Sequence, residues 1–456
     1  MVAHAAEVIV MVAADDARTR DGLRSMVLAL RRAFEGHPDG YGWANRLLAL
    51  RCLEARELCD EVILPRPVYG GRSLAHHRFA QQHPDRCLGE DDGLYGALEQ
   101  AFAEQALRLP RLFARDESAD VEPPPPAALT AAIRALAGQA ADGPGEQRSR
   151  AAFQSADALG WAYQYWHAER RAALLERLRS EPRFKLEGPH LVAATQLYTE
   201  PYMVRFLVDN TLGAIAAVLH PDQPTAQLAP LRLEDAPLPE LRPKRVEEIT
   251  VLDPACGSGH FLLGAFDALY AMYERQGSPT DPAEICACIL ERNLFGIDLD
   301  PRALQLAEAS LWMRAAERCG RFDAVRTNLA CPPADPDGDA AEIGSLLRVA
   351  AGPSDGSLFD LLGRRYDVVL ANPPYVDKRH QGGRLRAALR AGYPEAKGNT
   401  FAAFIVRALE LAQVAVGMVT PQTFLFVRSY EGLRRRLTAS SVVASLVQLG
   451  SGAFRD

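Results

Sequence analysis

The spacing of hydrophobic residues along the chain changes near position 186. Before it, apolar residues recur every three or four positions, which is typical of amphipathic helices. This spacing predicts helices at residues 23–34, 44–59, 93–109, 127–136 and 148–178. We therefore expect a mainly α-helical N-terminal domain at residues 1–185, in which the proline run at 123–126 is a break or a rigid linker.

Beyond position 186, short runs rich in β-branched residues alternate with helical patterns. The runs predict strands at residues 249–252, 294–297, 367–370, 415–419 and 442–449. Helical spacing falls at residues 259–273, 301–319 and 400–413. This alternation indicates an α/β domain over residues 186–456, with a parallel sheet covered by helices on both faces. Ligands of such sheets bind beyond the carboxyl ends of the strands. Residues 331–360, rich in Pro, Gly and Asp, are expected to form an irregular surface excursion.

The charge, the cysteines and the apolar runs of the sequence limit which partners are expected, among DNA, metals and membranes. The net charge is −7, from 51 Lys and Arg against 58 Asp and Glu, so any contact with DNA must come from local basic patches. The eight cysteines form no paired CxxC set, which supports neither a zinc site nor a disulfide framework. The apolar run at 8–14 is too short to span a bilayer and lacks a basic flank. We expect a cytoplasmic protein with no metal and no membrane partner.

The most informative motif is NPPY at 372–375, which ends the apolar run 366–371. The side-chain oxygen of Asn372 accepts hydrogen bonds, and Pro373 and Pro374 fix φ and donate no N–H. The face of Tyr375 can stack on a flat ring. Hydrogen bonds from an adenine N6 amine to the Asn372 oxygen and the Pro373 carbonyl would favour a pyramidal nitrogen that attacks a methyl group. The alternative is a strand that ends in a tight turn.

This chemistry rests on placement of the two reactants. Proximity, orientation and fixed dipoles would carry the catalysis. The target amine is buried in a duplex, so the base must be flipped out of the helix.

The segment DPACGSG at 253–259, which follows the first predicted strand, is called the first loop. Gly257 and Gly259 allow positive φ and close approach of a ligand to the backbone. A GxG pair also occurs in nucleotide-binding folds and in ordinary turns, but no Lys-Ser or Lys-Thr follows it, which argues against a P-loop. Asp253, at the strand end, suits a cationic ammonium or a ribose.

The end of the next strand carries two further acidic residues. Asp298 is placed to accept both hydroxyls of a ribose. Asp300, followed by Pro301, has the pattern of an N-cap and a first helical residue, which is a structural role.

At these residues the chain resembles S-adenosylmethionine-dependent amino-methyltransferases of DNA, of the gamma class that acts on adenine N6. ATQLYTEP at 194–201 is similar to the family's N-terminal cofactor motif, and KGNTFAAF at 397–404 and GMVTP at 417–421 are similar to its later motifs. The resemblance implies a Rossmann-like methyltransferase domain. It also implies that Thr199, Asp253, Ala255, Gly257, Gly259 and Asp298 bind S-adenosylmethionine.

The N-terminal half resembles a narrower group. WANRLLALR at 43–51 and LGWAYQY at 159–165 are similar to segments of the adenine-specific methyltransferases of phage growth limitation and BREX defence systems. That resemblance implies methylation of double-stranded host DNA as a mark of self.

Three features depart from the family. Pro333 stands where the family commonly has an acidic or amide residue on the cofactor adenine, and Asn399 where it more often has Asp. The family's C-terminal target-recognition region has no counterpart, so we expect sequence specificity to come from a separate segment or from other defence proteins. Phe454 follows a Gly, as the family's second base-stacking aromatic does, but an apolar residue at a strand start is the alternative.

Basic residues follow the NPPY motif at 372–375, which we call the target loop. Between 378 and 397 six basic side chains accompany one acid, Glu395. We expect Lys378, Arg379, Arg384 and Arg386 to contact DNA phosphates, with an affinity that falls steeply with salt. The run RRR at 434–436 is a second patch. Solvated helix faces are the alternative for both.

Three functions therefore fit the sequence. The first is an active adenine methyltransferase. The second is a catalytically impaired core that binds DNA or partner proteins in a defence complex. The third, methylation of cytosine N4 or of a protein glutamine amide, shares the NPPY chemistry, but the motif order and the defence resemblance favour adenine.

Overall fold

The computed structural model describes residues 2–114, 122–221, 233, 244–320, 322–323, 326–333, 340–349 and 356–450, with the backbone alone at 2–17 and 340–341. The chain forms two compact units. One comprises Met1–Ala168 and Glu308–Ala324, and the other comprises Glu169–Ala307 and Val325–Asp456. The division falls within two helices, α8 (Ala158–Ser180) and α13 (Pro301–Cys319).

Helices make up the described part of the first unit. They are α1 (Val2–Ala33), α2 (Gly40–Ala55), α3 (Leu74–Gln82), α4 (Leu94–Ala106), α5 (Pro110–Phe113), α6 (Pro126–Leu136), α7 (Glu146–Gln154), the first part of α8 and the last part of α13. The expected helix at 148–178 is two helices, since α7 ends at Gln154 and α8 begins at Ala158. Buried Arg51 on α2 donates to Ser149 Oγ at 3.3 Å and to the Leu136 carbonyl at 3.4 Å, which ties α2 to α6 and α7.

The second unit is an α/β structure, as expected. Its strands are β1 (Val251–Asp253), β2 (Leu294–Ile297), β3 (Asn328–Ala330), β4 (Tyr366–Ala371) and β5 (Ala412–Met418). Besides the last part of α8 and the first part of α13, its helices are α9 (Pro189–Thr195), α10 (Pro201–Leu219), α11 (His260–Gln276), α12 (Pro282–Cys288), α14 (Ala340–Ile343), α15 (Leu358–Gly363), α16 (Gly383–Gly392), α17 (Thr400–Leu411), α18 (Thr423–Phe426) and α19 (Glu431–Ser440). The strands form one parallel sheet of order β3-β2-β1-β4-β5.

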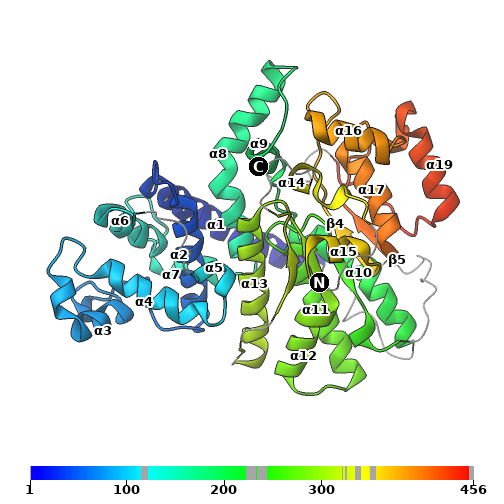
Figure 1. Ribbon diagram of the computed structural model, residues 1–456. Helices are drawn as coiled ribbons and strands as arrows, with labels where there is room; N and C mark the ends of the chain where they lie inside the picture. The colour runs from blue at the N-terminus through cyan, green and yellow to red at the C-terminus, as the bar shows by residue number, and fades with distance from the viewer. Residues whose placement is uncertain are drawn as a thin grey trace. The chain divides into compact units, whose positions relative to one another are not determined.

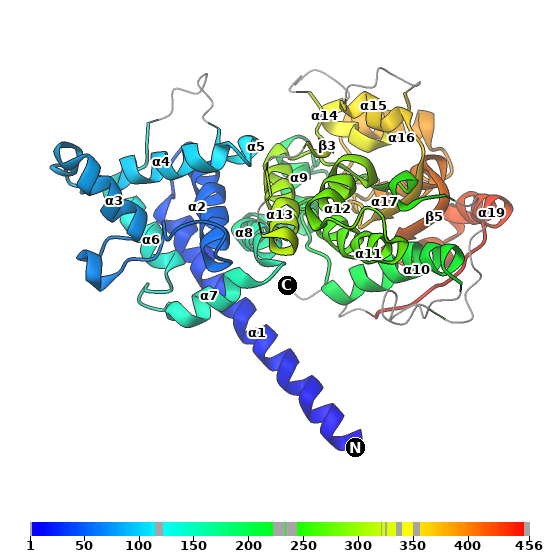
Figure 2. The ribbon, with the colours of Figure 1, turned by 90° about the horizontal axis from the view of Figure 1, so that it is seen from below.

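Helices cover both faces of the sheet (Figures 1 and 2). Residues on β2 alternate between these faces, because successive side chains of a strand point in opposite directions. Gly296 faces Leu262 of α11, whereas Phe295 and Ile297 belong to a buried cluster with side chains of α15 and α17. The parallel sheet with helices on both faces, predicted from the alternating pattern, and the Rossmann-like fold, implied by the resemblance, are therefore confirmed.

One expected strand is wrong. Residues 442–449 have no regular secondary structure, and Val442, Val443 and Leu446 are 79%, 60% and 65% exposed. This segment is rich in β-branched residues, but a strand also needs a second strand with which to form hydrogen bonds. Among the described strands, β5 pairs with β4 alone.

Segment 331–360 is more ordered than expected where it is described. It contains α14, α15 and a 3-10 turn at Gly344–Leu346. Ser345 and Leu346 are buried, so this segment packs into the second unit.

One described helix, α10, is long and apolar enough to span a membrane by length and composition. It is 61% buried and packs against α11, β4 and β5. Its apolar surface is thus used in the core of the α/β unit.

Candidate functional site

The two motif loops meet at the switch point of the sheet. The strand order reverses at β1, so β2 and β3 lie to one side of it and β4 and β5 to the other. β1 and β4 are hydrogen-bonded neighbours, with Val251 opposite Val368 and Leu252 opposite Val369. Asp253 is the last residue of β1, and Asn372 is the first residue after β4. This is the place at which doubly wound sheets bind ligands.

The glycines of the first loop have different surroundings. Gly257 has φ +52°, and a Cβ there would meet no atom within 4 Å. Gly259 has φ +88°, and a Cβ there would lie 3.0 Å from Ala307 Cβ on α13. Gly259 therefore serves close packing of α13 on the loop, while Gly257 keeps open space above the backbone.

Two carboxylates shape the same loop. Asp253, 1% exposed, accepts a hydrogen bond from the Ala255 N–H at 3.0 Å. Asp298, at the end of β2, accepts from the Gly257 N–H at 2.8 Å and from the Asp300 N–H at 2.9 Å. Each acid thus orders backbone next to the open space at Gly257.

Burial changes the acidity of both carboxyls. It raises the pKa of Asp253 well above its usual value, and the charge of Asp298 adds to that rise. Burial also raises the pKa of Asp298 to about 6, although N–H groups that donate to it oppose the shift. The cause is the loss of hydration of the charged form. A cationic or hydroxylated ligand would stabilise the charged form of these carboxyls in place of the lost water.

Asp300 has the structural role that the sequence indicated. Its Oδ1 accepts from the Arg302 N–H at 3.0 Å, and Pro301 is the first residue of α13. A side-chain acceptor of this kind satisfies one of the free N–H groups at a helix start.

The target loop is held by contacts that the sequence did not indicate. Asn372 Nδ2 donates to Thr199 Oγ1 at 3.1 Å. The Tyr375 hydroxyl lies 2.5 Å from Asn372 Oδ1 and 3.1 Å from the Val419 carbonyl oxygen. The hydroxyl of Thr400 donates to the Pro374 carbonyl. Only the fold reveals these partners, since they lie up to 173 positions away in the chain.

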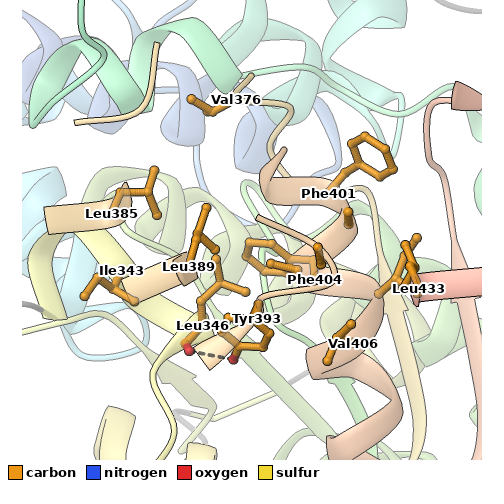
Figure 3. Close-up of a cluster of buried hydrophobic side chains, with 14 of the residues drawn as sticks. Ile343, Leu346, Val376, Leu385, Leu389, Tyr393, Phe401, Phe404, Val406 and Leu433 are labelled. Carbon is orange, nitrogen blue, oxygen red and sulfur yellow. Dashed lines mark hydrogen bonds between the residues drawn. The ribbon is translucent and has the colours of Figure 1, made fainter. Parts of the chain in front are cut away.

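Tyr375 rests on a buried apolar cluster. Its ring lies edge-on to Phe401, with centroids 6.2 Å apart at 88°. Phe401 belongs to the cluster of side chains from α16, α17, α19 and the turn after α14 (Figure 3). The Tyr393 hydroxyl in this cluster donates to the Leu346 carbonyl at 2.6 Å. The loop after β4 therefore packs against this apolar cluster.

The motif at 397–404 supports that loop. Asn399 caps α17 by accepting from the Phe401 N–H at 3.4 Å. Thr400 N–H donates to the Val376 carbonyl at 3.2 Å, and Thr400 Oγ1 accepts from the Val376 N–H at 2.8 Å. In the described residues this motif braces the backbone that follows Tyr375.

A further buried contact links the first loop to the segment after β3. Ser345 Oγ donates to the Pro254 carbonyl at 2.6 Å. Pro333, just beyond β3, is exposed. Phe454, the expected second stacking aromatic, lies outside the described residues.

The expected phosphate contacts differ in their surroundings. Lys378 is exposed, and Arg379 is exposed with an ion pair to Asp377 at 3.0 Å. Arg384 and Arg386 are half-buried on α16. Arg386 donates to the Lys378 carbonyl at 3.0 Å and so fixes the start of the basic segment.

The second basic run has structural partners. Arg434 donates to the Phe424 carbonyl at 2.7 Å. Arg436 pairs with Glu395 at 2.7 Å and with Glu410 at 2.9 Å. These contacts favour the structural interpretation of residues 434–436.

The chain is similar to known DNA-modifying enzymes. Residues 292–454 match the Eco57I restriction-modification methylase family. The chain is 26% identical to the adenine-specific methyltransferase BrxX of Escherichia coli O9:H4 (strain HS), over 91% of this chain and 42% of BrxX. It is 27% identical to the adenine-specific methyltransferase PglX of Lacticaseibacillus casei (strain Zhang), over 65% of this chain and 30% of PglX. The resemblance to adenine-specific methyltransferases indicated by the motifs is confirmed.

The chain spans less than half the length of these two relatives. Among solved structures, the DrdV–DNA complex determined by cryo-electron microscopy aligns with a TM-score of 0.40 and 16% identity, over 90% of this chain and 37% of the DrdV chain.

Proposed function

We propose that this chain is the catalytic core of a DNA adenine-N6 methyltransferase that uses S-adenosylmethionine. The carrying observation is the adjacency of the β1 and β4 loops, which joins an acidic, glycine-lined cradle to Asn372 and Tyr375 at one switch point. The named relatives, both adenine-specific methyltransferases, favour adenine over the other amines that NPPY chemistry serves.

The residues of the first loop fit S-adenosylmethionine. The space above Gly257 admits close approach to the backbone. Asp298 would accept the ribose hydroxyls, and Asp253 would stabilise the cationic end of the molecule from its buried position. When bound, S-adenosylmethionine supplies an electrophilic methyl group on a sulfonium sulfur. No Lys or metal is needed for this set, because the ligand carries no phosphate.

The residues of the target loop fit an exocyclic amine. Asn372 Oδ1 and the Pro373 carbonyl would accept its two hydrogens, which draws the nitrogen lone pair out of conjugation with the ring. Tyr375 would stack on the flipped base, a contact worth about 1–3 kcal/mol. Lys378 and Arg379, just after this loop, would hold the DNA backbone.

A role in phage defence follows from the resemblance to BREX-type enzymes. In this role the core marks double-stranded host DNA in the cytoplasm, and another segment or a partner protein supplies the recognition of a target sequence.

The deciding experiment measures binding and transfer separately. The chain is titrated with S-adenosylmethionine by calorimetry, then incubated with unmethylated genomic DNA, and N6-methyladenine is quantified by mass spectrometry. We expect Asn372→Ala to reduce transfer by roughly 100-fold or more without changing the Kd of S-adenosylmethionine. Asp253→Asn should weaken that Kd instead.

Asn210→Ala, an asparagine on α10 away from both loops, is the matched control and should leave transfer unchanged. Binding without transfer by the unaltered chain would favour the catalytically impaired core. Full transfer by Asn372→Ala would rule out the assignment of this loop.

A further inference from the structure

The amide of Asn372 lies between two hydroxyl groups from distant parts of the chain. Thr199 Oγ1 accepts from its nitrogen at 3.1 Å, and the Tyr375 hydroxyl lies 2.5 Å from its oxygen. Both ends of one amide are therefore occupied. An amide that was held at neither end could rotate and present nitrogen where an acceptor is required.

Thr199 is itself fixed in place. It is 4% exposed, and one residue, Glu200, separates it from the start of α10. Its neighbour Tyr198 stacks on His260, with ring centroids 4.2 Å apart at an angle of 6°. His260 is the first residue of α11 and follows Gly259. This stack anchors the segment that carries Thr199 to the helix behind the first loop.

The Tyr375 hydroxyl has one proton and two acceptors. Besides Asn372 Oδ1, the Val419 carbonyl lies 3.1 Å away. If an incoming amine takes the Asn372 oxygen, the hydroxyl can keep Val419 as its acceptor. The ring need not move, since it stays edge-on against Phe401.

We propose that Thr199 is a positioning residue that holds the Asn372 amide with its oxygen toward the target base, and that the Tyr375 hydroxyl occupies this oxygen until the target amine replaces it. The proposal rests on the proposed function and refines it, because it moves Thr199 from a contact of S-adenosylmethionine to a contact of Asn372. Asn372 is half-buried, and an acceptor shielded from water that lacks a donor is unfavourable. As a placeholder for the target amine, the Tyr375 hydroxyl therefore keeps the loop ordered between turnovers.

The first test reads the amide directly and needs no activity. The sequence holds six asparagines, at Asn45, Asn210, Asn293, Asn328, Asn372 and Asn399. Protein labelled with ¹⁵N only at asparagine should give six side-chain amide signals, and Asn372→Ala identifies one of them. We expect slow hydrogen exchange of the Asn372 amide in the unaltered chain and in Thr199→Ser, and faster exchange by about tenfold in Thr199→Val, for the loss of one hydrogen bond.

The second test separates a positioning role from cofactor binding. With Thr199→Val we expect kcat to fall about tenfold while the Kd of S-adenosylmethionine stays within about twofold, and Thr199→Ser should restore kcat. Tyr375→Phe keeps the ring and the Thr199 contact, so the exchange protection of the Asn372 amide should stay within about threefold.

The outcomes distinguish the proposed function from the positioning role of Thr199. If the unaltered chain transfers no methyl group, the proposed function fails, and the exchange measurement still decides whether Thr199 orients the amide. Unchanged exchange in Thr199→Val overturns the positioning role, as does a weaker Kd with an unchanged kcat. If Thr199→Val does not fold, a loss of kcat/KM in Tyr375→Phe as large as that in Asn372→Ala overturns the placeholder.

Discussion

In the proposed function, Asp298 is the residue whose acidity is most directly coupled to the binding of S-adenosylmethionine. Burial raises its pKa to about 6, and the carboxylate of Asp300 adds to the rise. Below pH 6 the carboxyl is mostly protonated, and a neutral carboxyl is a weaker acceptor for the two hydroxyl donors than a carboxylate. Asp253, whose pKa is also raised, lies beside it. Ligand affinity should therefore depend on pH in the range where most carboxyls are already charged.

We predict that the affinity for S-adenosylmethionine rises between pH 5 and pH 7 and is then level, with protons released on binding near pH 6. Calorimetry in buffers of different ionisation enthalpy measures both. Asp298→Asn should bind more weakly at pH 7 and show a flatter profile. Stability has the opposite sign, because a raised folded pKa favours the folded state at low pH and loses that contribution as pH rises through about 6. A profile that is the same in both proteins would contradict the assignment.

Some of these residues could be placed from sequence alone and others could not. Asp253, Asp298 and Asn372 each end a strand, so a parallel sheet brings them to one edge. The contacts of Thr199 and Ser345 depend on chain segments that return from far away, and no local pattern encodes them. A threonine in a motif indicates that its hydroxyl is used, but not by which partner.

At the scale of elements, local chemistry decided which expectations held. The start of α13 was readable because Asp and Pro act within one turn of the helix. The segment at 442–449 has the composition of a strand, but a strand also needs a pairing partner. In the described residues this segment has no partner in the sheet.

The cap of α13 offers an element-scale prediction. Asp300→Ala removes the acceptor for the Arg302 N–H, so the free energy of unfolding should fall by about 1 kcal/mol. Asp300→Asn keeps an acceptor and should lose less than half of that amount. Urea unfolding at pH 8, where Asp298 is charged in both variants, makes the comparison. Equal losses in the two variants would mean that the charge of Asp300, and not its capping bond, is what stabilises the helix.

At the scale of the whole molecule, the proposed function requires the chain to bind a polyanion while it carries a net charge of −7. Binding then depends on where cations are free to face DNA, not on their number. The run at 434–436 is rich in arginine, yet its side chains are engaged with backbone carbonyls and carboxylates. In the described part of the chain, Lys378 and Arg390 are exposed cations of the segment that directly follows the target loop.

We predict that Lys378 and Arg390 account for part of the salt dependence of DNA binding. Each phosphate contact contributes about −0.9 to the slope of log K against log salt, so Lys378→Ala with Arg390→Ala should make the slope shallower by roughly 1–2. Arg435→Ala is the matched control. Its side chain is 80% exposed but pairs with Glu431 one helical turn away on α19, and the slope should not change. Fluorescence anisotropy of a labelled duplex from 50 to 300 mM salt measures both. An equal change in the control would mean that net charge, and not the segment after Tyr375, governs the affinity.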